Sequence, residues 1–86
     1  MAQRQEATWR SILNDLIGHH HLDITYADGA MGPLHNQQWT GSYTWNNTAH
    51  GSVIIGTATA TSRKHAKELA AEAAVRYLRG RNYTLD

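Results

Sequence analysis

The sequence contains no cysteine, no phenylalanine and a single proline among its 86 residues. Without cysteine, the chain can form neither a disulfide framework nor a zinc site built on thiolates. It also lacks any run close to the ~20 apolar residues of a membrane-spanning helix, and no signal-peptide pattern opens it. We therefore expect an intracellular protein, in the cytoplasm or the nucleus, with no membrane partner.

Motifs for catalysis are also missing from the sequence. Serine, histidine and aspartate all occur, but no nucleophile motif brings them together, so we predict no catalytic residues and no cofactor. Three adjacent histidines, residues 19–21, form a conspicuous run of metal-ligand side chains. Adjacent residues point in different directions and lack the i, i+4 spacing of a helical metal pair. We interpret the run as a solvated loop and predict no metal site.

Net charge is only +1, but the charges are unevenly distributed along the chain. Residues 1–62 hold two arginines and four acidic residues, whereas residues 63–86 hold six basic residues and three acidic ones. Such an asymmetry is a weak indication of an electrostatic partner. A solvated, charged helix face remains the simpler interpretation at this point.

Two segments have the apolar spacing of amphipathic helices. Between residues 8 and 18, apolar side chains recur at i, i+3, i+4, i+7 and i+8, with Thr8 placed to cap the helix and Gly18 to end it. The alanine-rich segment 62–79 predicts a second helix, with Ser62 as its cap. We expect its buried stripe to consist of Ala66, Leu69, Ala70, Ala73 and Tyr77. Its surface offers two ordinary i, i+4 ion pairs, Lys64 with Glu68 and Glu72 with Arg76.

Between these helices, three segments predict strands. Residues 24–26 alternate in polarity, residues 38–45 place large side chains on one side at period two, and residues 52–60 are rich in β-branched residues. Residues 29–36 contain two glycines and the only proline and predict a loop, while residues 46–51 predict a turn. The order α-β-β-β-α predicts an α+β fold, in which a three-stranded antiparallel sheet has two helices packed on one face.

The second predicted helix has basic residues at its N-terminus, the end at which the helix dipole disfavours positive charge. A helix dipole favours acids at its N-terminus, yet Arg63, Lys64 and Lys67 all fall at this end and project from nearly one side. Free backbone N–H groups, a positive dipole end and three cations together predict a site for a multiply charged anion. On this turn alone, a solvated helix end is the simpler alternative, because surface charges cost little.

The chain as a whole resembles the double-stranded-RNA-binding domain. Residues 63–67 (RKHAK) fill the places of that family's Lys-Lys-x-Ala-Lys motif, and an alanine-rich stretch follows them. Residues 32–35 (GPLH) match its Gly-Pro-x-His loop, and Trp39 stands where the family has a large aromatic residue opening its second strand. Residues 13–15 (LND) resemble the Leu-Asn-Glu of its first helix.

The resemblance spans about residues 8–79, and we expect residues 1–86 to form a single domain of this kind. It implies binding to A-form duplex RNA by shape, largely independently of sequence, over ~16 base pairs. Three contacts are implied, two in successive minor grooves and one on the phosphates across the major groove between them. The matching residues are Ser11 and Asp15 for the first minor groove, Pro33 and His35 for the second, and Arg63, Lys64 and Lys67 for the phosphates.

The alternative function is a protein-interaction or dimerisation module of the same fold, with weak RNA binding. Exposure of Tyr43, Val53 or Ile55 on the free face of the sheet would favour it. The resemblance also implies a context, because such domains are appended to ribonuclease III-type nucleases, Dicer-like enzymes and deaminases, in RNA processing and RNA silencing. We therefore expect double-stranded RNA as the partner, with a protein partner or a homodimer as the alternative.

Two features depart from the family's pattern. Ala58 and Ala60 stand where glycines often precede the basic turn, so we expect the third strand to run on regularly. Gly41 occupies a position where a β-branched core residue is usual, and we expect Trp45 or Tyr77 to fill the space.

Overall fold

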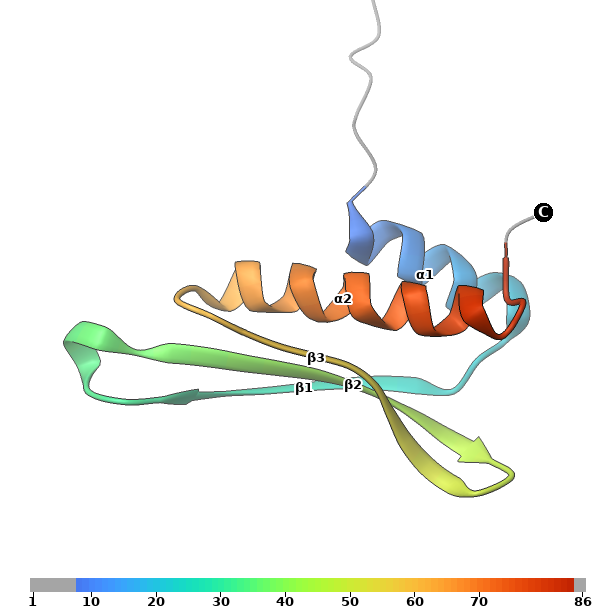
Figure 1. Cartoon of the computed structure of the whole chain (residues 1–86), viewed down its shortest axis with the longest axis horizontal. Helices are drawn as coiled ribbons and strands as arrows, with labels where there is room; N and C mark the ends of the chain where they lie inside the picture. The colour runs from blue at the N-terminus through green and yellow to red at the C-terminus, as the bar shows by residue number, and fades with distance from the viewer. Residues whose placement is uncertain (1–7, 85–86) are drawn as a thin grey trace, which may run out of the picture.

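The computed structural model describes residues 8–84 and confirms the predicted α-β-β-β-α order. Both helices lie on one side of an antiparallel sheet whose strand order is β1-β2-β3 (Figure 1). No helix within residues 8–84 is long and apolar enough to cross a membrane. The elements are α1 (Trp9–His20), β1 (Ile24–Met31), η1 (Leu34–Asn36, a short 3-10 helix), β2 (Gln38–Thr48), β3 (Gly51–Ala60) and α2 (Arg63–Gly80).

α1 begins where the sequence predicted but ends later. The backbone N–H of Ser11 donates to the Thr8 hydroxyl, and the backbone N–H of Thr8 donates to the Ser11 hydroxyl, each at 3.1 Å. The helix passes through Gly18 and ends after His20, where His21 adopts the left-handed conformation at φ 55°. That residue closes the last turn, so a glycine is not needed to end the helix. The predicted solvated loop at the histidines is therefore wrong, because most of the run is helical.

The strands are longer than predicted, because pairing extends them into the expected loop and turn. β1 continues to Met31, so the loop covers residues 32–37 rather than 29–36. β2 and β3 stay paired almost to their tip, where a two-residue turn replaces the predicted turn at residues 46–51. β3 runs on to Ala60, as predicted. Cross-strand hydrogen bonds thus extend the strands through residues whose local sequence alone indicates a turn.

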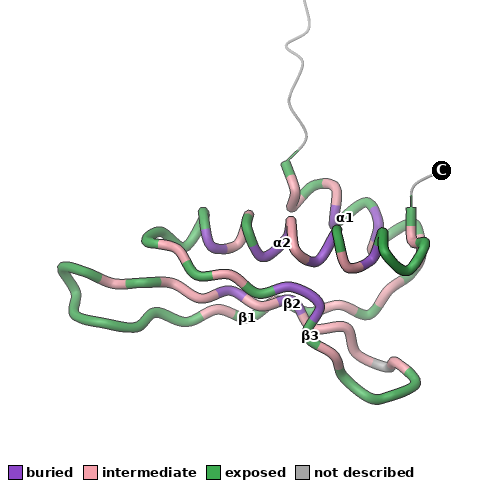
Figure 2. The backbone as a smooth tube through the Cα atoms, viewed as in Figure 1, coloured by how far each residue is buried: buried purple, intermediate pink, exposed green. Residues whose placement is uncertain are grey.

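The core lies between the sheet and the helices (Figure 2). Of the stripe predicted for α2, Ala66 and Ala70 are buried, Ala73 and Tyr77 are half-buried, and Leu69 is 37% exposed. The prediction that Leu69 is buried is wrong. Because α2 packs against both the sheet and α1, its buried surface is wider than one stripe and lies on the side of the helix away from Leu69. The buried hydrophobic residues are Leu13, Leu16, Tyr43, Ile55, Ala66, Ala70, Ala71, Ala74, Val75 and Leu78.

α2 lies close to β3 at Gly56. A Cβ atom at this position would lie 2.6 Å from the backbone nitrogen of Ala74 and 3.0 Å from its Cα, and would collide with the carbonyl oxygen of Ala70. These neighbours are helix backbone, which cannot rotate away as a side chain can. Two alanines on α2 and a glycine on β3 therefore set the distance between the layers.

The space above Gly41 is filled by Tyr26, not by Trp45 or Tyr77 as predicted. The register places Asp28 opposite Gly41, which makes Tyr26 a diagonal neighbour whose hydroxyl would collide with a Cβ there. The hydroxyl is buried, without a partner in hydrogen-bonding geometry among residues 8–84. Burial, followed by the nearby Asp28 carboxylate, raises the pKa of Tyr26 to about 12, so this phenol is neutral at physiological pH.

The face of the sheet that points away from the helices is rich in hydroxyl groups. Hydrogen bonds of 3.0 and 3.2 Å bridge β2 and β3 in the pairs Thr40 with Thr59 and Ser42 with Thr57. Ile54 is 61% exposed there. Tyr43 and Ile55 are instead buried in the core, and Val53 packs against it. Tyr43, Val53 and Ile55, whose exposure would have favoured an interaction module, therefore lie on the face that the helices cover.

Candidate nucleic-acid interface

α1 carries the two predicted minor-groove residues one turn apart on its exposed surface. The Ser11 hydroxyl donates its only proton to the Thr8 carbonyl oxygen (2.9 Å) and accepts the backbone N–H of Thr8. It can still accept a further hydrogen bond, but it has no proton left to donate. Asp15 is exposed and is also an acceptor when ionised. This surface therefore suits donors such as 2′-hydroxyl groups.

The loop between β1 and β2 holds its residues in a tight turn. Gly32 adopts φ 96°, and a Cβ there would lie 3.0 Å from the carbonyl oxygen of Asn36. The backbone N–H of Asn36 donates to the Pro33 carbonyl oxygen (2.9 Å), which closes η1. Pro33 and His35 are exposed, and Leu34 between them is 91% exposed. The loop thus presents its side chains outward on a short, closed backbone.

The first turn of α2 is capped and basic. The Ser62 hydroxyl accepts the backbone N–H of His65 (3.1 Å), and no acidic residue lies in this turn. Lys64 is exposed, while Lys67 is half-buried with its ammonium 4.8 Å from the centroid of the Tyr26 ring. The ion pairs within residues 8–84 include neither lysine. Both charges therefore remain for a partner.

Arg63 is held differently from these two lysines. Its Nε donates to the Asp28 carboxylate on β1 (2.8 Å), and its guanidinium lies 5.5 Å from the centroid of the Trp39 ring on β2. The Asp28 side chain is only 12% exposed, and the hydrogen bond from Arg63 lowers the pKa of this carboxyl. The pair is therefore formed at neutral pH and is lost only as the pH falls through that lowered pKa. Arg63 fastens the first turn of α2 to the sheet.

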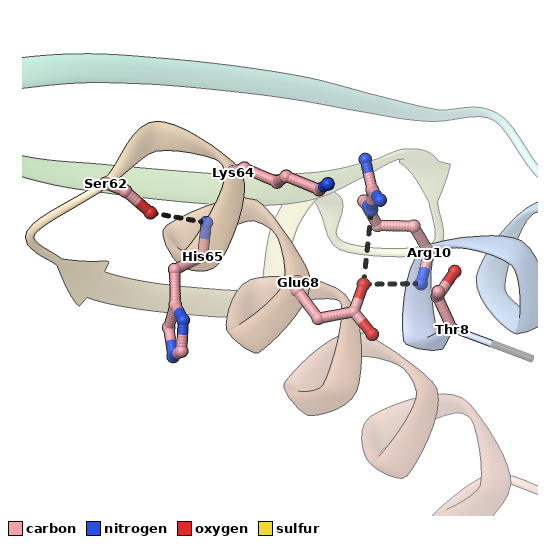
Figure 3. A pocket seen from close by; sticks show the side chains of 6 residues that line it. All are labelled: Thr8, Arg10, Ser62, Lys64, His65 and Glu68. Carbon is pink, nitrogen blue, oxygen red and sulfur yellow. Dashed lines mark hydrogen bonds and ion pairs between the residues drawn. The ribbon is translucent and has the colours of Figure 1, made fainter. Parts of the chain in front are cut away.

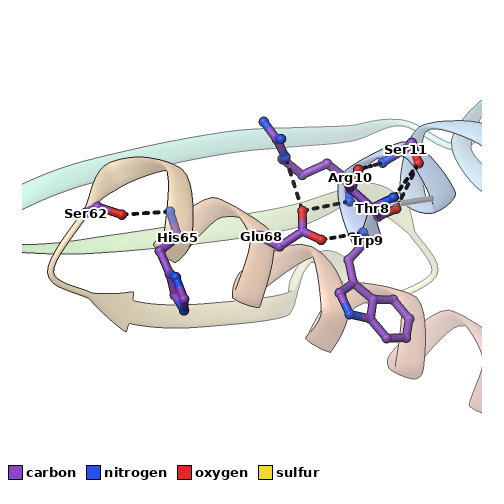
Figure 4. A network of polar contacts seen from close by, with 7 residues as sticks. All are labelled: Thr8, Trp9, Arg10, Ser11, Ser62, His65 and Glu68. Atoms are coloured by element: carbon purple, nitrogen blue, oxygen red, sulfur yellow. Dashed lines mark hydrogen bonds and ion pairs between the residues drawn. The ribbon is translucent and has the colours of Figure 1, made fainter. Parts of the chain in front are cut away.

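Glu68 joins the two helices. Its carboxylate accepts the backbone N–H groups of Trp9 (2.6 Å) and Arg10 (3.3 Å) at the start of α1, and also Nε of the Arg10 side chain (3.2 Å) (Figure 4). Glu68 thus caps α1 from α2. The predicted surface pair with Lys64 is wrong, whereas the predicted pair of Glu72 with Arg76 is present at 2.8 Å.

The sequence contains one indication that α1 is capped by a residue from elsewhere in the chain. The first turn of α1 holds no acidic residue, although the free N–H groups there favour one. A carboxylate from elsewhere in the chain would satisfy them. Nothing in the sequence, however, indicates that Glu68, 59 positions from Trp9, supplies it.

Arg10 lies beside both lysines of the first turn of α2. It lines a hollow of about 320 Å³ with Lys64, toward which Figure 3 shows both side chains extending, and a second hollow of about 240 Å³ with Lys67. The tertiary structure therefore brings together Arg10, Lys64 and Lys67, which we name the basic cluster. Arg63, which the sequence places with the lysines, donates from Nε to Asp28, and its side chain is 67% exposed.

We expect Glu68→Ala to lower the free energy of unfolding by about 1–3 kcal/mol, because it leaves two backbone donors of α1 and a guanidinium without their acceptor. Urea denaturation followed by circular dichroism measures the change. Glu72→Ala is the matched control, since Glu72 forms only an exposed i, i+4 pair on the same helix, and should cost less than about 0.5 kcal/mol. Equal losses in the two variants would contradict the capping role.

Within residues 8–84, no three histidine, cysteine, aspartate or glutamate side chains gather as a metal site would require. A search of curated proteins found no match to the chain. The family described as "Double-stranded RNA binding motif" does match, over residues 9–78, which takes in both helices up to Leu78 and the whole sheet. This match covers most of the chain and agrees with the fold and with the capped, basic start of α2. The chain therefore belongs to the double-stranded-RNA-binding motif family.

Proposed function

We propose that this protein binds double-stranded RNA by the shape of its A-form helix, through α1, the loop at residues 32–37 and the start of α2. The observation that carries the proposal is the basic cluster, in which Lys64 and Lys67 lie at a capped helix N-terminus and take part in none of the ion pairs of residues 8–84. Their positions match the basic motif of the family. Backbone N–H groups and cations at such an end favour phosphate.

The three surfaces suit different parts of the duplex. Ser11 and Asp15 accept hydrogen bonds from 2′-hydroxyl groups in one minor groove, and Pro33 and His35 enter the next. The lysines hold phosphates across the major groove, which strengthens binding without reading sequence. Arg63 fixes the first turn of α2 in place through the bond from its Nε to Asp28, and its side chain, which is 67% exposed, offers its terminal nitrogens to phosphate beside the lysines.

The proposal extends to the setting of the protein. A domain that binds duplex RNA suits an accessory role beside an RNA-processing enzyme, inside the cell. The interaction module, with a protein partner or a second copy, is the alternative outcome of the test. Burial of Tyr43 and Ile55 removes the feature that would have favoured it.

The test is titration of the protein into an RNA duplex of about 18–20 base pairs, just longer than the ~16 that one domain spans, and into a DNA duplex of matched sequence. Fluorescence anisotropy at two salt concentrations measures both affinities. We expect micromolar or tighter RNA binding that weakens with salt, and much weaker DNA binding, because DNA lacks the 2′-hydroxyl. Equally feeble binding to both, with elution as a dimer, would support the interaction module instead.

A further inference from the structure

The second hollow brings Lys67, the last lysine of the basic motif, together with side chains of α1 that do not belong to the motif. It lies between α1, the sheet and α2, and has a volume of about 240 Å³. Its charged or amide side chains are Arg10, Asn14 and Lys67, and its remaining lining is Ile17, Ile24, Tyr26 and Tyr43. No carboxylate of residues 8–84 lines it. The hollow therefore offers two cations and an amide donor in front of a partly apolar wall.

Glu68 holds the Arg10 side chain in an orientation that leaves part of its guanidinium available to a ligand. Glu68 accepts from Nε of Arg10, which fixes the side chain and leaves its two terminal nitrogens without a hydrogen-bond partner among residues 8–84. The Arg10 side chain is 34% exposed, so a ligand on the surface can reach it. Two planar N–H groups presented side by side match the oxygens of a phosphate.

The other two polar residues converge on the same space. Asn14 is exposed and lies one turn along α1 from Arg10, on the stripe next to Ser11 and Asp15. Lys67 brings a second positive charge from α2 and lies over the Tyr26 ring at 4.8 Å. Glu68 neutralises part of the charge of Arg10, and the positive charge that remains on Arg10 and Lys67 attracts an anion into the hollow. The hollow lies between the minor-groove surface of α1 and the basic start of α2.

We propose that Arg10, Asn14 and Lys67 form a phosphate subsite in this hollow. The inference rests on the proposed function, because the phosphate it would take is a backbone phosphate of duplex RNA, between the first minor-groove contact and the major-groove contact. A free phosphate ion has the same chemistry and would fit the same groups. The subsite joins Arg10 and Asn14 of α1 to Lys67 of α2, and of these three only Lys67 belongs to the family's basic motif.

The test compares Arg10→Gln with Arg79→Gln, which removes the same charge from the exposed last turn of α2. We expect Arg10→Gln to weaken RNA binding about tenfold, as for one charged hydrogen bond, and to reduce the slope of log K against log[salt] by roughly 0.7–0.9. Arg79→Gln should change neither quantity. Circular dichroism verifies that both variants are folded.

A second measurement works without RNA and does not depend on the proposed function. Inorganic phosphate is titrated into the free wild-type protein, and NMR follows the side-chain signals of Arg10, Asn14 and Lys67. Saturable shifts of these signals support the subsite. Asn14→Asp, which puts a carboxylate into the hollow, should abolish them, whereas Asn82→Asp makes the same change at an exposed position just beyond α2 and should not.

The outcomes separate the two proposals. RNA binding that Arg10→Gln and Arg79→Gln affect equally, with no phosphate shifts in the hollow, would overturn the subsite and leave the RNA function standing. Saturable phosphate shifts without RNA binding by the wild type would overturn the RNA function and leave an anion site for free phosphate. Absence of both would overturn both.

Discussion

Gly56→Ala is expected to lower the free energy of unfolding by about 3 kcal/mol or more, a large share of the roughly 5–15 kcal/mol typical of a folded domain. The added methyl group would lie 2.6 Å from the backbone nitrogen of Ala74 and 3.0 Å from its Cα. Only a shift of α2 away from β3 can relieve this overlap. Such a shift would open the contacts that bury Ile55, Ala70 and Val75.

Urea denaturation followed by tryptophan fluorescence measures this loss, since the chain has three tryptophans. Gly29→Ala is the matched control, because Gly29 also lies in a strand but has no atom within 4 Å of the position its Cβ would take. We expect that variant to keep its stability within about 1 kcal/mol of the wild type. If Gly56→Ala proved as stable as Gly29→Ala, the close approach of α2 to β3 would be wrong.

The double variant Lys64→Gln/Lys67→Gln is expected to weaken RNA binding about 100-fold or more at physiological salt. Each lysine that contacts phosphate contributes roughly 0.7–0.9 to the slope of log K against log[salt], so the slope should fall by roughly twice that amount. Neither lysine belongs to the ion pairs within residues 8–84, so the fold should retain its stability. Anisotropy titrations at several salt concentrations measure both effects.

Two controls test whether position or total charge matters in this double variant. Arg76→Gln/Arg79→Gln removes the same charge from the other end of α2 and should weaken binding only slightly. Arg63→Gln should weaken it less than either lysine variant does alone, because Arg63 is engaged with Asp28 and Trp39. A loss as large as that of the lysine pair in the first control would indicate diffuse electrostatic binding.

Several features of this protein could be predicted because their physics is local. The caps at Thr8 and Ser62 depend on a hydroxyl and an N–H three residues apart. The order of helices and strands follows from the periodicity of apolar residues, which reflects the geometry of each element. Element ends were less predictable, since pairing across the sheet extended β1 to Met31 and a left-handed His21 closed α1.

The candidate site was predictable only in part, because some of its contacts are local and others join residues far apart in the sequence. The sequence indicated Ser11, Asp15, Pro33 and His35, and the structure keeps them accessible on α1 and the loop; their contacts with RNA remain a prediction. It grouped three cations by their spacing on one helix. It could not indicate that one of them lies against a carboxylate on β1, since that depends on how the helix sits on the sheet.

The sequence by itself determined the elements, the caps and the positive charge at the start of α2. The tertiary structure alone decided which charges remain free. Asp28 binds Arg63 across 35 positions of sequence, and Glu68 binds Arg10 across 58. Such pairs depend on layer distances set by packed backbone, as at Gly56, rather than on the properties of neighbouring residues. The fold thereby joins Arg10 of α1 to the two lysines of α2.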